Sequence, residues 1–305
     1  MFKKQLPTAL KQGDKVALIA PSSPPENHSL VESGAYFIKN LGLVPVIGES
    51  CYSQYGYLSG NDDIRAYDIN WAFADPSISG IFCIRGGYGL QRILDKIDFE
   101  SIKNNPKFFC GYSDITALHN AIPDRTGLIS FHTPMLSTPK FAEADPYTLE
   151  HFTRQIFGNS KGKIINPKGH EWKFLQNGKA KGELCGGNLS IIVSSLKTPY
   201  EINCTGKILF IEEVEEAPYK IDRMLNQLRL AGKLDECVGI IFGDFADCMS
   251  PEPEKSLTIN EIIQNLKLKV PILWNFRCGH CYPTASLPMG MTARLDATSD
   301  TFEIL

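Results

Sequence analysis

A serine stands where an apolar segment gives way to a helical pattern in the stretch KFFCGYSDITALHNAI. Ser113 follows the strand-like run Lys107 to Cys110 and precedes a helix expected from Ile115, with Gly111 permitting a tight bend. A hydroxyl at such a turn is exposed at the carboxyl edge of a sheet, at the positive end of a helix that favours a developing oxyanion. Since Ser and Asp also cap ordinary helices, this candidate nucleophile needs partners elsewhere.

A glycine-rich turn follows another buried run in IFCIRGGYGLQRIL. Its spacing is neither G-x-G-x-x-G nor a P-loop, so it does not indicate a nucleotide phosphate site. Paired glycines let the backbone approach a substrate closely and donate an unhindered N–H. Gly86 and Gly87 are therefore candidates for one oxyanion donor, and the backbone N–H of Asp114 is the candidate for the other. A plain tight turn between strand and helix is the alternative.

An acidic residue directly ends the apolar run in KILFIEEVEEAPYKIDRML. A carboxylate at the end of a buried strand is costly unless it is paired, so Glu212 is a candidate functional acid. We expect the neighbouring Glu213, Glu215 and Glu216 to lie on a solvated face or near a helix N-terminus.

A histidine in the loop NFRCGHCYPTASLPMG can serve as the base. His280 follows an apolar strand-like run, and an imidazole that titrates near neutrality suits general-base catalysis. Cys278, His280 and Cys281 together also raise the alternative of a metal site. Structural zinc sites carry a second close Cys or His pair, which this sequence lacks, so we predict no metal.

The elements around these residues indicate an α/β fold. In the first half, short β-branched runs alternate with helical segments, which predicts a three-layer domain around a parallel sheet. The second half carries strand-like runs and helices of a smaller, mixed α/β domain. We expect an N-terminal domain over residues 1–145, a linker region over 146–178 and a C-terminal domain over 179–305.

Composition excludes several classes of protein. The net charge of -3 and the absence of a basic run argue against nucleic acid as a partner. Nine cysteines, an odd number in a chain too large to need disulfides, favour a reducing compartment. The run Val16 to Ala20 is too short for a signal core or a membrane span. These features predict a cytoplasmic protein without a membrane partner.

Several stretches, in this order, resemble the serine LD-carboxypeptidases, which include muramoyl-tetrapeptide carboxypeptidases and microcin C7 self-immunity hydrolases. The similar stretches span nearly the whole chain: VALIAPSSP, GYLSGNDDIRAYDINWAFADP, IRGGYG, FCGYSDITALHNAI, GELCGGNLS, ILFIEEVEEAPYKIDRML and GHCYP. One departure is FHTPM, where the family shows F-H-G-P. Thr133 replaces a glycine there, beside His132, a candidate for lining the substrate cleft.

The resemblance implies a catalytic triad of Ser113 as nucleophile, Glu212 as acid and His280 as base, carried by two domains of a homodimeric protein. It also implies hydrolysis of the amide between the L-centre of a diamino acid and a terminal D-Ala in murein tetrapeptides, as in peptidoglycan recycling. The backbone N–H groups of Gly87 and Asp114 would stabilise the oxyanion, and no cofactor is required. Recognition of the free carboxylate needs a cation, for which Arg85 is the candidate.

Two other functions remain open from the sequence. The same triad could act on peptidyl or aminoacyl nucleotide antibiotics, as in the immunity branch of the family. The same cleft could instead belong to a protein that binds muropeptides without turning them over.

Overall fold

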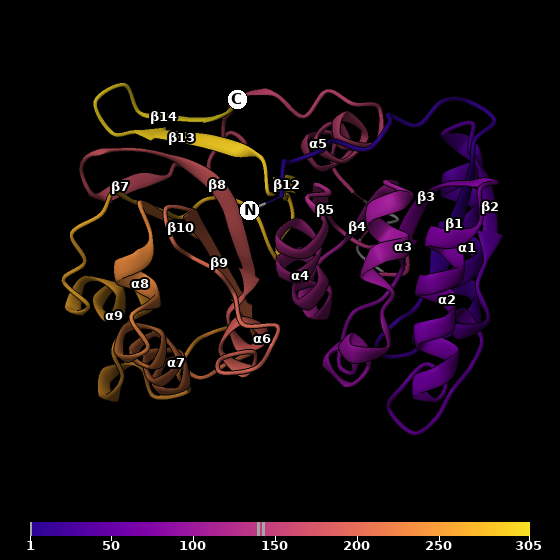
Figure 1. Cartoon of the computed structure of the whole chain (residues 1–305). Helices are drawn as coiled ribbons and strands as arrows, with labels where there is room; N and C mark the ends of the chain where they lie inside the picture. Colours follow the sequence, from indigo (N-terminus) through magenta and orange to yellow (C-terminus); the bar gives the residue numbers. More distant parts are fainter. Residues whose placement is uncertain (1, 139–140, 142–143) are drawn as a thin grey trace. The chain divides into compact units, whose positions relative to one another are not determined.

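The chain forms two compact units, each with its own sheet (Figure 1). The computed structural model describes residues 2–138, 141 and 144–305. The first unit comprises Met1–Ser160 and Ser286–Gly290, and the second comprises Lys161–Ala285 and Met291–Leu305. No helix of the described residues has the length and apolar character needed to cross a bilayer.

The first unit is built on a six-stranded sheet of order β12-β5-β4-β3-β1-β2. Its strands are β1 (Lys15–Ile19), β2 (Val44–Ile47), β3 (Ile78–Cys83), β4 (Phe108–Gly111), β5 (Ser130–His132) and β12 (Leu287–Met289). The first five are parallel, and β12 runs antiparallel to β5. Parallel strands end at the same edge, so the loops after β1, β3 and β4 gather there.

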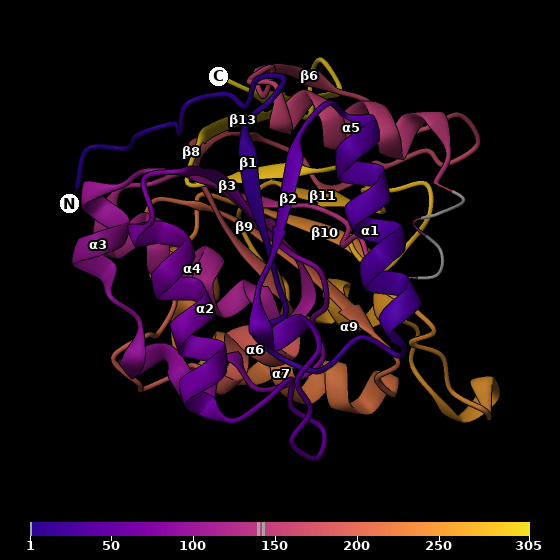
Figure 2. The ribbon, with the colours of Figure 1, turned by 90° about the vertical axis from the view of Figure 1, so that its right-hand side faces the viewer.

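Helices cover both faces of this sheet. They are α1 (His28–Asn40), α2 (Asp62–Ala74), α3 (Phe99–Asn104), α4 (Thr116–Thr126) and α5 (Pro146–Ile156), with short 3₁₀ turns η1 (Glu49–Cys51), η2 (Leu90–Lys96) and η3 (Ser113–Ile115). Figure 2 shows α1 and α5 on one side of the strands and α2, α3 and α4 on the other. The parallel three-layer α/β domain expected from the sequence is confirmed.

Aromatic residues show how the strands bury both faces. Successive side chains of a strand point to opposite faces. Phe108 of β4 stacks on Phe131 with ring centroids 4.7 Å apart, whereas the next residue, Phe109, packs against Phe73 of α2. Continuous apolar runs rather than alternating ones therefore mark these strands in the sequence.

The second unit is a mixed eight-stranded sheet of order β6-β14-β13-β8-β9-β10-β11-β7. Its strands are β6 (Gly162–Ile164), β7 (Lys173–Gln176), β8 (Lys179–Asn188), β9 (Ile208–Val214), β10 (Gly239–Ala246), β11 (Ile272–Trp274), β13 (Thr292–Asp296) and β14 (Thr301–Ile304). The central four, β8 to β11, are parallel, and antiparallel strands flank them on both sides.

The helices of the second unit share one apolar core with the central strands. They are α6 (Leu189–Ser194), α7 (Pro218–Leu230), α8 (Lys233–Glu236) and α9 (Ile259–Asn265), with a 3₁₀ turn η5 (Pro253–Lys255). Leu209 and Ile211 of β9, Ile221 and Leu225 of α7 and Ile262 of α9 are at most 1% exposed within this core. This packing fixes the carboxyl end of β9, where Glu212 lies.

Candidate active site

Ser113 lies in strained backbone at the end of β4. Its φ angle of 63° is in the left-handed region, which side chains other than glycine rarely adopt. The 3₁₀ turn η3 begins at this residue and continues into α4. His119 of α4 holds the preceding bend, because its Nε2 lies 2.8 Å from the carbonyl oxygen of Gly111. A strained serine between a parallel strand and a helix is typical of nucleophile turns in α/β hydrolases.

The glycine-rich turn after β3 packs directly on this serine. A Cβ atom at Gly86 would lie 2.9 Å from Cβ and 3.1 Å from Oγ of Ser113, so only glycine fits. Ser23, in the loop after β1, holds the turn from the other side. Its N–H donates to Gly86 O at 3.0 Å, and its Oγ accepts from the N–H of Tyr88 at 3.1 Å. Gly87 between them has a φ of 96° and is packed against Ser23.

A buried charge network joins the same loops. The carboxylate of Asp114 accepts the N–H of Leu90 at 2.8 Å, which anchors the far end of the glycine turn. Arg65 of α2 is fully buried and donates to Pro21 O and Gly89 O, both at 2.8 Å, and it pairs with Asp62. Burial raises the pKa of Asp114, against the hydrogen bond from Leu90 and the charge of Arg65. Sequence reasoning missed Arg65, although it lies in a stretch shared with the resembled family.

Arg85 and His132 occupy different surroundings. The guanidinium of Arg85 is partly exposed and lies 3.4 Å from the carboxylate of Glu26. His132 is buried at the end of β5, opposite Gly111 in the sheet, with its ring 5.9 Å from that of Tyr112. Thr133 is fully buried and donates its N–H to Gly111 O at 2.9 Å. This backbone hydrogen bond supports the bend before Ser113, and a glycine at position 133 would donate it equally.

The second unit brings the expected acid and base together. Nδ1 of His280 lies 2.6 Å from Oε2 of Glu212. An ionised carboxylate only accepts hydrogen bonds, so Nδ1 carries a proton and Nε2 of a neutral ring is left as the base. The Glu212 side chain is wholly inaccessible, whereas that of His280 keeps 16% of its surface exposed. This arrangement suits proton transfer at Nε2.

Local packing fixes the geometry of this pair. Gly279 has a φ of 125°, and a Cβ there would lie 2.8 Å from Oε2 of Glu212. Burial lowers the pKa of His280, but the charge and the hydrogen bond of Glu212 outweigh it, so the pKa is raised above its ordinary value. Asp244 and Arg277 form an ion pair of 2.7 Å nearby, and Arg277 also donates to Tyr282 O in the His280 loop.

Glu213 corrects one expectation from the sequence. It is 2% exposed rather than solvated. Its carboxylate accepts from Nδ2 of Asn188 at 2.7 Å, and from the N–H and Oγ of Ser190 at 2.8 and 2.6 Å. Burial raises its pKa, against these hydrogen bonds. Glu213 therefore fastens the start of α6 to β9, while Glu215 is exposed as expected.

The two cysteines around His280 are buried. Cys278 directs its thiol to Ala285 O at 3.3 Å and Cys281 directs its thiol to Pro283 O at 3.6 Å. Burial raises the pKa of Cys281 to about 12. Among the described residues there is no group of three or more His, Cys, Asp or Glu side chains arranged to hold a metal ion.

Ser113 thus belongs to the first unit, together with Gly86, Gly87, Asp114, Arg85 and His132, and the Glu212–His280 pair belongs to the second. Two family models match these regions: the LD-carboxypeptidase N-terminal domain over residues 16–133 and the LD-carboxypeptidase C-terminal domain over residues 181–295. The chain belongs to the LD-carboxypeptidase family. The resemblance drawn from the sequence motifs is confirmed, and with it the assignment to a family of peptidases.

Individual relatives of this family are similar over nearly their whole length. A probable murein peptide carboxypeptidase of Bacillus subtilis (strain 168) is 41% identical, over 97% of this chain and 92% of the relative. A solved muramoyltetrapeptide carboxypeptidase from Oxalobacter formigenes aligns with a TM-score of 0.82 at 25% identity, over 95% of this chain and 97% of that one. MccF, solved in complex with glutamyl sulfamoyl guanosine, aligns with a TM-score of 0.86 at 26% identity, over 98% of both chains.

Proposed function

We propose that this LD-carboxypeptidase hydrolyses the amide that links a diamino acid to the terminal D-Ala of murein tetrapeptides, in peptidoglycan recycling. The observation that carries the proposal is the 2.6 Å contact between Glu212 and His280, which leaves Nε2 of a half-buried imidazole as a base. The strained Ser113 supplies the matching nucleophile. The 41% identity to a probable murein peptide carboxypeptidase supports the choice of substrate.

The proposed mechanism uses Ser113, His280 and Glu212 as a triad. Oγ of Ser113 attacks the carbonyl carbon of the diamino acid while Nε2 of His280 takes the hydroxyl proton. The C–N bond then breaks, and His280 returns the proton to the amine of the departing D-Ala. Water, deprotonated by the same imidazole, attacks the acyl-enzyme, and the imidazolium returns this proton to Oγ of Ser113 as the C–O bond to the serine breaks. Glu212 holds the ring in the productive tautomer throughout.

We assign the oxyanion to the backbone N–H groups of Gly87 and Asp114. The first lies in the turn that packs on Ser113, and the second follows Ser113 at the start of a helical turn. Such donors contribute roughly 3 to 4 kcal/mol each to the transition state in other hydrolases. We assign the terminal carboxylate of the substrate to Arg85, which is partly exposed and forms an ion pair with the exposed Glu26, and part of the cleft wall to His132. We also propose that the enzyme is cytoplasmic and forms a homodimer.

The decisive experiment is mass-spectrometric detection of D-Ala released from murein tetrapeptide. We expect release by the wild-type protein and none above background by Ser113→Ala. Turnover by Ser113→Ala at the wild-type rate would disprove the assignment of the nucleophile. Binding of the tetrapeptide by the wild-type protein without any turnover would instead favour a muropeptide-binding protein.

A second candidate substrate is an aminoacyl nucleotide. The similarity to MccF, solved with glutamyl sulfamoyl guanosine, favours testing it. Parallel assays of the purified protein on murein tetrapeptide and on an aminoacyl sulfamoyl nucleotide separate the two. A larger kcat/KM for the nucleotide would replace the proposed substrate while leaving the triad in place.

A further inference from the structure

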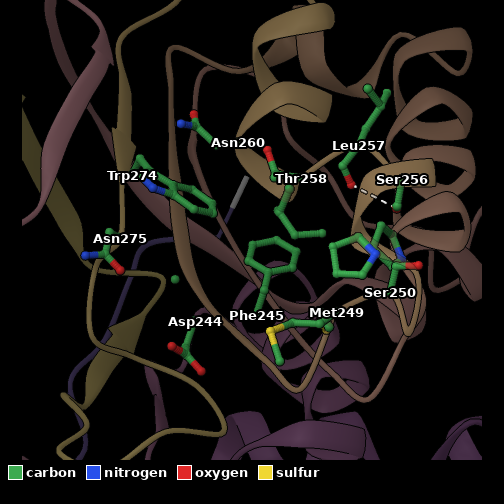
Figure 3. Close-up of a pocket in the computed structure, with 15 residues that line it drawn as sticks. Asp244, Phe245, Met249, Ser250, Ser256, Leu257, Thr258, Asn260, Trp274 and Asn275 are labelled. Atoms are coloured by element: carbon green, nitrogen blue, oxygen red, sulfur yellow. Dashed lines mark hydrogen bonds between the residues drawn. The ribbon is translucent and has the colours of Figure 1, made fainter.

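The second unit contains a cavity of about 480 Å³ at the carboxyl ends of β10 and β11 (Figure 3). Phe245 and Trp274 form a stacked aromatic wall, with ring centroids 6.0 Å apart and planes inclined by 29°. Met249 and Leu257, at the cavity, remain 79% and 46% exposed. Large apolar side chains left in contact with water around a concavity are typical of a ligand site.

One charge marks this otherwise neutral cavity. Asp244 is the single charged residue among the fifteen that line it. Its side chain is 17% exposed and pairs with Arg277 through Oδ1. Burial raises the pKa of Asp244, against the charge of Arg277, so a ligand that brought a second positive charge would relieve an unfavourable environment for the carboxylate. An anionic ligand group would be repelled there.

The cavity is also tied to the acid–base pair. The N–H of Asp244 donates to Cys278 O at 2.9 Å, two residues before His280. Gly243, another lining residue, has no room for a Cβ, which would lie 2.5 Å from the same carbonyl oxygen. The negative charge of Asp244 also raises the pKa of His280. The aromatic wall is therefore tied to the segment that carries the proposed general base: Phe245 follows Asp244 directly, and Trp274 precedes His280 by six residues.

These features specify the ligand chemistry. A substrate residue whose carbonyl is attacked carries its side chain only one carbon away from that carbonyl, so the side chain must lie close to the catalytic base. The wall of Phe245 and Trp274 suits an aliphatic chain, and Asp244 suits an ammonium group, with an added cation–π attraction. A diamino acid has both parts.

Building on the proposed function, we infer that this cavity binds the side chain of the diamino acid that donates the scissile carbonyl, with its free amine bound by Asp244. Asp244 is thereby a specificity-determining residue. It favours a cationic side chain at this position and disfavours an acidic one.

The test compares two tetrapeptides that differ only at the third residue, lysine or Nε-acetyl-lysine, each followed by D-Ala. We expect the wild-type kcat/KM to be at least about tenfold higher for the free amine, as for a charge-assisted hydrogen bond. Asp244→Asn should bring the ratio close to one. Because Asp244→Asn also removes the ion pair with Arg277, its overall rate is not the readout; the ratio of kcat/KM for the two peptides tests the inference.

A matched control removes one negative charge just beyond the end of the same strand, β10. Asp247, three residues further, is exposed, lies outside the cavity and has a φ of 54°, which asparagine tolerates. Asp247→Asn should keep the wild-type ratio. If Asp244→Asn is inactive on both peptides, calorimetry on Ser113→Ala and on Ser113→Ala with Asp244→Asn measures the same ratio as affinities.

The outcomes separate this inference from the proposed function. Absence of D-Ala release from every tetrapeptide would refute the proposed function. Equal kcat/KM for D-Ala release from both peptides would overturn the cavity inference. A preference for the free amine that persists in Asp244→Asn would overturn it too. Neither result would contradict the carboxypeptidase activity.

Discussion

Nδ1 of His280 lies 2.6 Å from Oε2 of a Glu212 side chain that is wholly inaccessible to solvent. Burial of the imidazole alone would lower its pKa, and the charge of Glu212 reverses the direction. The acid limb of kcat/KM should therefore have its midpoint above 6.5, since the base must be unprotonated. Glu212→Gln should move this midpoint to lower pH and reduce kcat roughly 10³- to 10⁴-fold.

The measurement is a pH profile of kcat/KM for both proteins on murein tetrapeptide. A wild-type midpoint at or below 6.5 would contradict the raised pKa.

The raised pKa of His280 also makes folding stability depend on pH. Because the folded-state pKa of His280 is raised, the stability it contributes is complete below about 6.5 and is lost as the pH rises through the raised value.

Two substitutions of Ser113 separate the loss of its hydroxyl from the strain in its backbone. Both Ser113→Ala and Ser113→Gly lack the hydroxyl, so each should lose roughly 10⁴-fold or more in kcat. They differ in stability, because the φ of 63° strains alanine and leaves glycine unstrained. We expect urea unfolding to show the glycine variant more stable than the alanine variant by about 1 kcal/mol. Equal stabilities would show that the turn relaxes.

Glu213 should matter for stability rather than for catalysis. Glu213→Gln places an amide where the carboxylate accepts from Asn188 and from two groups of Ser190. The free energy of unfolding should fall by about 1 to 3 kcal/mol. Glu215→Gln, at an exposed position, should change it by less than about 0.5 kcal/mol. Thermal unfolding of both variants checks this. If Glu213→Gln loses as little unfolding free energy as Glu215→Gln, the hydrogen bonds of Glu213 to Asn188 and Ser190 do not stabilise the fold.

Local sequence signals predicted the first unit well. Asn61 stands before the helical segment 62–74 and has a side chain preferred at helix N-caps, and its Oδ1 accepts the N–H of Ile64 at 2.9 Å. The apolar spacing of Leu90 to Ile97 predicts a helix, but the segment forms the 3₁₀ turn η2. Apolar residues three apart suit both forms, so periodicity does not separate them. The N–H of Leu90 is also taken by Asp114, a tertiary contact that no local pattern contains.

Contacts between residues far apart in the sequence could not be predicted from local patterns. Strand β12 (Leu287–Met289) is three residues long, contains a proline and joins β5 of the first unit across more than half the chain. Neither propensity nor spacing marks such a strand. In the candidate site, the Glu212–His280 contact was anticipated through the family resemblance. The Asp244–Arg277 pair was not, because each residue by itself looks like an ordinary charge at a strand end.

The contact between Gly86 and Ser113 offers a test of how closely the glycine turn controls the nucleophile. Gly86→Ala would place a Cβ 2.9 Å from Cβ and 3.1 Å from Oγ of Ser113, so the serine must shift. Displacement of a reacting atom by this route should reduce kcat about 10- to 100-fold. Gly34→Ala is the matched control, since its Cβ would meet Leu136 Cβ at 3.0 Å and no atom of Ser113 within 4 Å. It should leave kcat on murein tetrapeptide near the wild-type value. Equal losses of kcat in both variants would mean that crowding in this unit, rather than the position of Ser113, limits the reaction.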